Sequence, residues 1–193
     1  TLSVTAILLI PSAISATIDL GTGKITNSTT GLDSTNANVS GLASGITFDL
    51  GINANVRTVS SQTAGLGVSG GTAGGGLDNN DDAVPGNDEA LTFIITNVTG
   101  LGAGESLVFT GVQTSFGFNG GEFYSIDGGA ATAFLSSPET HSVPNSTSFT
   151  LAAAGGGVTR FAVSELYFDV IPEPSSAVLV GLGIVGLSVR RRR

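Results

Sequence analysis

Residues 158–170 read VTRFAVSELYFDV and form the longest run of β-branched and aromatic residues in the chain. A strand with one buried face alternates its side chains between two sides. Here the two expected sets are Phe161, Val163 and Glu165 on one side, and Ala162, Ser164 and Leu166 on the other. Polar and apolar residues are not cleanly separated between these sets. The run therefore predicts a β-strand, and it predicts the direction of each side chain less well.

Shorter runs of the same composition recur along the chain. They cover residues 45–52, 56–60, 90–98, 106–112, 121–127 and 146–152. In the run at 106–112, SLVFTGV, Leu107, Phe109 and Gly111 are expected on one side, and Val108, Thr110 and Val112 on the other. The turn signals NGG at 119–121 and DGG at 127–129 favour antiparallel hairpins between such runs.

The pattern of these runs predicts the fold class. Long amphipathic helices, βαβ alternation and a fixed-period repeat are all absent from the sequence. We therefore expect an all-β body, an antiparallel β-sandwich with jelly-roll-like connectivity, rather than a solenoid. The ten Phe residues are expected in its core.

Charge restricts the partners of this body. Only 11% of the residues are charged, and four of the seven basic residues are Arg190–Arg193. The rest of the chain sets three basic residues against fifteen acids. Such a body is not expected to bind nucleic acid through its phosphates. The chain has no Cys, which excludes disulfides, thiolate zinc sites and a Cys nucleophile.

Residues 61–93 combine glycine with acid and are expected to form a long loop or a pair of loops. Five carboxylates of this segment are candidate ligands for Ca²⁺, an ion that takes six to eight oxygen ligands. They are Asp78, Asp81, Asp82, Asp88 and Glu89. Their spacing is not that of an EF-hand. The alternative interpretation is a solvated acidic loop without a metal.

Catalytic motifs are scarce. His141 is the only histidine, and it lies in the polar stretch SSPETHSVPNS at 136–146, which predicts an ordinary surface histidine. A G-x-S-x-G nucleophile motif does not accompany it. A pair of carboxylates for glycoside hydrolysis stays open as an alternative, but the chain has no Trp and two Tyr. We therefore expect that the protein is not an enzyme.

The first twenty residues, TLSVTAILLIPSAISATIDL, combine an apolar run with a Pro and small residues. This order is typical of the rear part of a secretory signal peptide. Residues 1–16 are assigned to it, with a cut after Ser15 or Ala16. The alternative is a first β-strand of the body.

Residues 170–193 read VIPEPSSAVLVGLGIVGLSVRRRR and differ from everything before them. The stretch GLGIVG at 181–186 matches the G-x-G-x-x-G pattern of dinucleotide-binding proteins, but the sequence lacks the βαβ unit on which that motif depends. Ser175–Val189 is uncharged and is followed by four arginines. A helix of this length spans about 22 Å, less than the hydrocarbon core of about 30 Å. These residues predict a single weak or transient membrane helix with its arginines in the cytoplasm.

Three adjacent parts of this segment carry a family resemblance. Pro172-Glu173-Pro174, the apolar stretch Ala177–Val189 and the terminal arginines resemble the PEP-CTERM sorting signal of Gram-negative bacteria that produce exopolysaccharide. The resemblance implies an exosortase as partner, a membrane-embedded Cys protease that processes the protein at the cell envelope. It also implies that Pro172, Glu173 and Pro174 are the recognition motif. The residues implied to act as the cytoplasmic stop are Arg190, Arg191, Arg192 and Arg193.

Together these features predict three regions and a function. Residues 1–16 are the remnant of a signal peptide, residues 17–169 a β-sandwich ectodomain, and residues 170–193 the sorting signal with a transmembrane segment at 175–189. The expected function is that of an exported, non-catalytic protein of the cell surface or extracellular matrix, associated with exopolysaccharide. The alternatives are a Ca²⁺-dependent carbohydrate-binding module and a secreted hydrolase with an acid pair.

Overall fold

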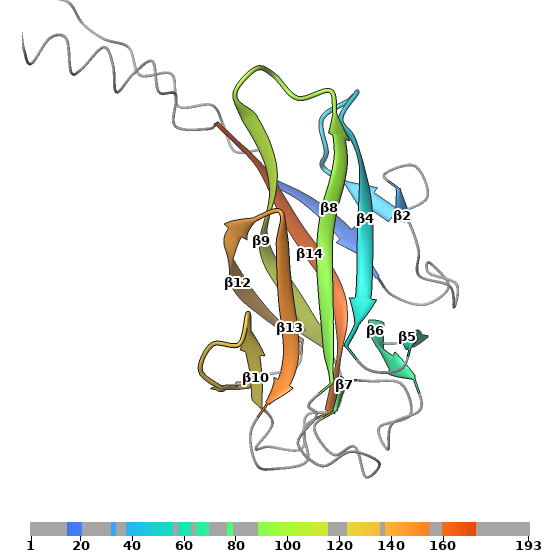
Figure 1. Cartoon of the computed structure of the whole chain (residues 1–193), viewed down its shortest axis with the longest axis vertical. Coiled ribbons are helices and arrows are strands. Elements are labelled where there is room, and N and C mark those ends of the chain that lie inside the picture. The colour runs from blue at the N-terminus through green and yellow to red at the C-terminus, as the bar shows by residue number, and fades with distance from the viewer. Residues whose placement is uncertain are drawn as a thin grey trace, which may run out of the picture.

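A computed structural model describes most of the β-rich body. The described residues are 15–20, 32–33, 38–55, 58–62, 65–69, 77–78, 89–115, 123–135, 138–154 and 160–172. Within them the chain forms two antiparallel sheets that pack as two layers, and it forms no helix (Figure 1). The predicted all-β sandwich is confirmed. The expected C-terminal helix lies outside the described residues.

The first sheet, called here the β14 sheet, has the order β12-β9-β14-β1-β3, and β6 and β7 also pair with β14. Its strands are β12 (Glu139–Ser146), β9 (Glu105–Ser115), β14 (Arg160–Pro172), β1 (Ser15–Asp19), β3 (Asn38–Ser40), β5 (Thr58–Gln62), β6 (Gly65–Ser69) and β7 (Leu77–Asp78). The strand β5 joins this sheet through β6.

The second sheet, the β8 sheet, has the order β11-β10-β13-β8-β4-β2. Its strands are β11 (Thr132–Ala133), β10 (Phe123–Ile126), β13 (Ser148–Ala154), β8 (Ala90–Thr99), β4 (Thr47–Ala54) and β2 (Leu32–Asp33). The chain crosses between the sheets from β8 to β9 and again from β12 to β13, while β8 pairs with β13 and β9 with β12. The segment β8–β9 is thus paired along its length with the segment β12–β13, and this two-stranded ribbon bends from one sheet into the other. Such wrapping of a ribbon is typical of a jelly roll.

A chain of phenylalanine rings joins the two sheets. Centroids lie 5.5 Å apart for Phe48 and Phe168, 4.9 Å for Phe168 and Phe109, and 4.9 Å for Phe109 and Phe149. Phe93 stacks on Phe149 at 5.1 Å. All five rings are buried. Each such contact adds about 0.5–1.5 kcal/mol to the free energy of burial. This phenylalanine chain is therefore the centre of the predicted Phe core.

Two β-bulges in the β9–β14 pair correct the expected directions of the side chains. Ser164 is an extra residue on β14, and Thr110 is an extra residue on β9. After Ser164 the buried set changes from Phe161 and Val163 to Leu166, Phe168 and Val170. A bulge shifts alternation by one residue. Glu165, which was expected on the side of Phe161, therefore lies on the opposite face.

The bulge on β9 has the same effect on its own strand. Val112 is buried with Leu107 and Phe109, although Val112 was expected on the other side. Thr110, the extra residue, changes the alternation between them. The imperfect alternation at 106–112 and at 158–170 thus has the same kind of cause, a β-bulge in each strand.

The segment 61–93 is not a loop throughout, contrary to expectation. Gly65–Ser69 forms β6, which pairs with β5 and with Val163 of β14. Leu66 and Val68 are fully buried. Gly65 has a φ of +139°, and a Cβ there would overlap the carbonyl of Val163. This glycine therefore allows a close approach of two strands, whereas glycine in a sequence usually indicates a loop.

The ends of the body differ slightly from the expected boundaries. β1 begins at Ser15, and Ala16 is buried. A cut after Ser15 would keep Ala16 in the core, whereas a cut after Ala16 would remove it. Residues 1–14 lie outside the described part, and the signal peptide stays a prediction. At the other end β14 continues to Pro172.

Two glycines of the β8–β9 turn allow a matched test of this packing. Gly100 and Gly104 have φ values of +79° and +76°, but only a Cβ at Gly100 would overlap backbone, that of Gly45. We expect Gly104→Ala to lower the free energy of unfolding by about 1 kcal/mol through its backbone conformation alone. Gly100→Ala should cost about 3 kcal/mol or more. Urea unfolding measures both free energies. Equal losses in the two variants would contradict the close contact of Gly100 with the backbone of Gly45.

Candidate functional site

The predicted recognition motif begins inside the β14 sheet. Pro172 is the last residue of β14 and is the partner of Glu105 at the start of β9. Its side chain is exposed, whereas Val170 two residues earlier is buried in the core. Proline has no N–H and ends a ladder readily. The motif therefore starts directly at the end of the folded sheet, and Glu173 and Pro174 lie outside the described residues.

The membrane segment and the arginine stop are not tested by the structure. In the part of the chain that is described, no helix is long and apolar enough to cross a membrane. The helix predicted at Ser175–Val189 lies outside that part and stays a prediction. The same holds for the four residues of the predicted cytoplasmic stop, Arg190, Arg191, Arg192 and Arg193.

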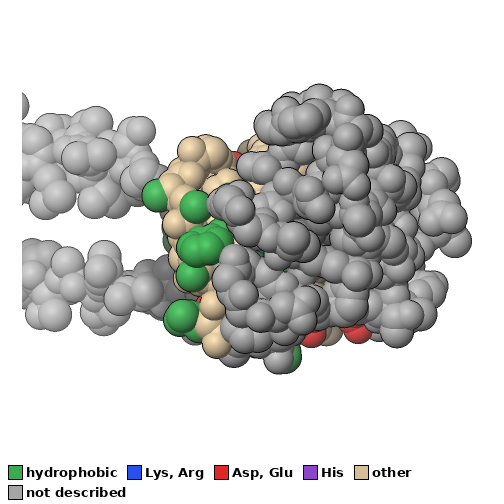
Figure 2. Space-filling view, turned by 90° about the horizontal axis from the view of Figure 1, so that it is seen from below, with side chains coloured by type: hydrophobic (Ala, Val, Ile, Leu, Met, Phe, Trp, Pro, Cys, Tyr) green, Lys and Arg blue, Asp and Glu red, His purple; other side chains and the backbone are tan. Residues whose placement is uncertain are grey.

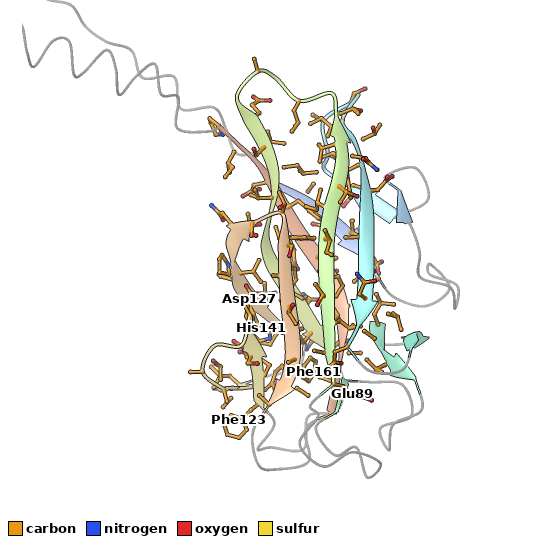
Figure 3. All side chains as sticks on the ribbon, in the orientation of Figure 1. Glu89, Phe123, Asp127, His141 and Phe161 are labelled. Carbon is orange, nitrogen blue, oxygen red and sulfur yellow. The ribbon has the colours of Figure 1, made fainter. Side chains whose placement is uncertain are left out.

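The candidate calcium ligands are only partly described. Glu89 is fully buried at the lower end of the sandwich (Figure 3), and its carbonyl accepts a 2.9 Å hydrogen bond from the N–H of Ala153. The backbone of Asp78 pairs with that of Arg160. Asp81, Asp82 and Asp88 lie outside the described residues. Among the described ones, no three His, Cys, Asp or Glu residues are grouped to hold a metal, so the calcium site stays a prediction.

His141 is buried, which corrects the expected surface histidine. It is 4% exposed, and its Nε2 lies 2.9 Å from the hydroxyl of Thr114 on β9. The imidazole packs on the ring of Tyr124 from β10 at 4.0 Å and on Phe134 at 5.5 Å, measured between ring centroids. The polar neighbours in sequence indicated a surface position, but β12 alternates as a strand with one buried side. The alternation of His141 and Val143 with Ser142 was the signal that could have revealed this burial.

Burial favours the neutral form of this imidazole. Burial lowers the pKa of His141, and the carboxylate of Glu139 opposes that shift in part. Burial and the same carboxylate raise the pKa of Tyr124. Glu139 in turn accepts a 2.7 Å hydrogen bond from the N–H of Leu135. The cluster thus acts as packing between the sheets and gives a substrate almost no access to the ring.

A second polar cluster lies on the outer face of the β14 sheet, and sequence reasoning missed it. The bulge at Ser164 turns Glu165 and Tyr167 outward, next to Gln113 of β9. The hydroxyl of Tyr167 donates to Glu165 at 2.7 Å, and Gln113 Nε2 donates to the hydroxyl of Tyr167 at 3.3 Å. Burial and the bond to Glu165 raise the pKa of Tyr167. This half-exposed cluster can exchange hydrogen bonds with hydroxyl groups of a ligand.

The buried histidine predicts a loss of stability in acid. Its pKa in the folded state lies below the value of 6.5 that it has when unfolded. The unfolded chain therefore binds a proton first, and the free energy of unfolding falls as the pH drops below about 6.5. His141→Gln keeps a polar group for Thr114 but cannot take up this proton. We expect thermal melts between about pH 7.5 and 5 to show a smaller loss for the variant; an identical loss would contradict the prediction.

The acidic segment predicts a response to calcium. If its carboxylates bind the ion, Ca²⁺ at a hundredfold excess over its Kd stabilises the fold by about 2.7 kcal/mol. We expect the melting temperature to rise with Ca²⁺, to return with EDTA, and to respond less to Mg²⁺. The double variant Asp81→Asn, Asp82→Asn should lose the response. An unchanged melting temperature would favour the solvated loop.

Comparison with protein families identifies the C-terminal segment. Residues 170–193 match the family described as the PEP-CTERM protein-sorting motif. Comparisons with curated proteins and with solved structures give no match. The matched residues include the end of β14 and the predicted recognition motif. The chain therefore carries a PEP-CTERM protein-sorting motif at residues 170–193, which makes it an exported, cell-envelope-associated protein whose sorting depends on an exosortase.

Proposed function

We propose that the protein is a non-catalytic component of the cell surface or extracellular matrix of a Gram-negative bacterium, where it associates with exopolysaccharide. The observation that carries the proposal is the position of the sorting motif. It matches at residues 170–193 and begins on the last strand of the sandwich. The sandwich is therefore the part that sorting delivers, and the function depends on its surface.

A non-catalytic role is supported by the position of the lone histidine. A Ser-His-Asp mechanism would have to use His141. This ring is held between Thr114, Tyr124 and Phe134 and is 4% exposed. It serves the packing of the sandwich and is not placed to exchange protons with a substrate.

Association with polysaccharide is supported by hydroxyl groups on both outer faces. On the β8 sheet, the hydroxyls of Thr92 and Thr150 lie 2.9 Å apart on neighbouring strands. On the β14 sheet, Tyr167 is joined to Glu165 and Gln113. Figure 2, which views the sandwich from below, shows hydrophobic side chains on one side of the described surface and acidic ones along its lower edge. Hydroxyl-bearing faces on a body with three basic residues and fifteen acids suit a polymer of hydroxyl groups better than a phosphate polymer.

The tail has a separate and temporary role in this proposal. Ser175–Val189 holds the exported chain in the membrane, and Arg190–Arg193 stay in the cytoplasm. The exosortase recognises Pro172, Glu173 and Pro174 and processes the tail. The sandwich is then retained at the cell surface or in the polysaccharide matrix.

Mass spectrometry of the exported protein from an exopolysaccharide-producing host tests this function. We expect the mature protein to have lost the residues that follow the Pro172–Pro174 motif, and to sediment with isolated exopolysaccharide. Glu173→Ala should keep the whole tail and remain with the membrane, because the recognition motif is changed. Ser175→Ala lies next to the motif but outside it and should behave as the unchanged protein.

Two results would contradict the proposal in different ways. An intact Arg193 in the mature exported pool would exclude sorting with removal of the tail. A processed protein that does not sediment with exopolysaccharide would exclude the association with the matrix and leave the sorting in place.

A further inference from the structure

The end of the sandwich from which the tail leaves has a defined structure, and we call it the exit end. It consists of the β8–β9 turn at residues 100–104, the loop at residues 41–46 and the paired residues Glu105 and Pro172. Figure 1 shows the end of β14 at the same end of the sandwich as the β8–β9 turn. The loop at 41–46 joins them because Thr47 pairs with Thr99.

Chain length limits how far the exit end can lie from the uncharged segment. Ser175 follows Pro172 by three positions, so their Cα atoms are at most about 11 Å apart. Glu105 lies one antiparallel spacing from Pro172, about 5 Å. A headgroup layer is about 5–7 Å thick on each side of the hydrocarbon core. If the segment from Ser175 is in the bilayer, the exit end is therefore at the headgroups.

The surface of the exit end suits that position. Residues 41–46 and 100–104 read GLASGI and GLGAG and contain no charged side chain. Leu42, Ile46 and Leu101 are half-buried against the core. The single acid, Glu105, is held back by a 2.8 Å hydrogen bond from the N–H of Gly102. Small neutral and apolar residues lose little hydration when they contact headgroups.

The exit end is also held together firmly enough to act as one surface. The hydroxyls of Thr47 and Thr99 lie 2.7 Å apart across its base. Gly100 contacts the backbone of Gly45 so closely that a side chain would not fit. The two turns therefore present a fixed shape to whatever they contact.

We propose that, while the tail is in the membrane, the exit end rests on the phospholipid headgroup layer and orients the sandwich with the lower end of β8 away from the bilayer. The partner is the lipid surface itself. This inference rests on the proposed function, because it requires that Ser175–Val189 is embedded. From Glu89 to Thr99 a strand extends about 33 Å, so the two ends of β8 are in different environments.

A pair of labelled variants tests the contact in the full chain. The sequence has no Cys, so Ala103→Cys and Ala131→Cys each give one labelling site. Both alanines are exposed; Ala103 lies in the exit end and Ala131 in the loop before β11. Each variant carries an environment-sensitive fluorophore and is reconstituted in phosphatidylethanolamine/phosphatidylglycerol vesicles that contain a lipid with a nitroxide on its headgroup. Melting curves of the labelled proteins check that both are folded.

We expect the headgroup nitroxide to quench the label at 103 several-fold more than the label at 131. A Gly/Ser spacer of about twelve residues between Pro174 and Ser175, with an end-to-end distance of about 19 Å, should remove most of that difference. Equal quenching at both positions in protein that floats with the vesicles would overturn the inference and leave the proposed function intact. Protein that fails to float would overturn the inference together with the membrane role of the tail.

Discussion

The antiparallel pairing of β14 with β9 is the constraint on which the rest of the structure depends. It runs from Ala162 and Ser115 to Pro172 and Glu105 and contains two bulges. Because one bulge lies on each strand, at Ser164 and at Thr110, the second restores the register that the first changes. Without the bulge at Ser164, every later side chain of β14 would change faces. Phe168 would then leave the phenylalanine chain that joins the sheets.

The bulge at Ser164 also separates the two polar clusters described above. Before Ser164, β14 gives Phe161 to the interior, where its ring lies 4.9 Å from Phe134 beside the buried His141. After Ser164, Glu165 and Tyr167 turn to the outer face. One strand therefore supplies a packed, neutral interior and a hydroxyl-bearing exterior within seven residues. Its position between β9 and β1 fixes both.

The sequence could predict the strands because their signal is local, and it could not predict what depends on pairing. The runs at 90–98 and 106–112 correspond to β8 and β9, since β-branched and aromatic residues favour strands wherever they lie. The positions of the bulges, the partners of His141 and the strand at Gly65–Ser69 depend on which residues the partner strand supplies. Thr114 and Val163 are distant in sequence from His141 and Gly65, so a single-chain pattern contains no sign of them. In the sorting motif, the residues themselves are the signal that a partner recognises. The motif could therefore be identified from the sequence alone.

The sheet also limits where the tail can be separated from the body. Residues 170–172 belong both to the matched motif and to β14, where they pair with Leu107, Ser106 and Glu105. Val170 is buried with the core, so a body that ended before it would expose Leu107 and leave the start of β9 without a partner strand. The loss of a buried Val side chain costs about 1.5–3 kcal/mol in burial alone. A stable mature sandwich therefore retains β14 to its end. The predicted recognition motif, Pro172-Glu173-Pro174, begins on the last residue of that strand.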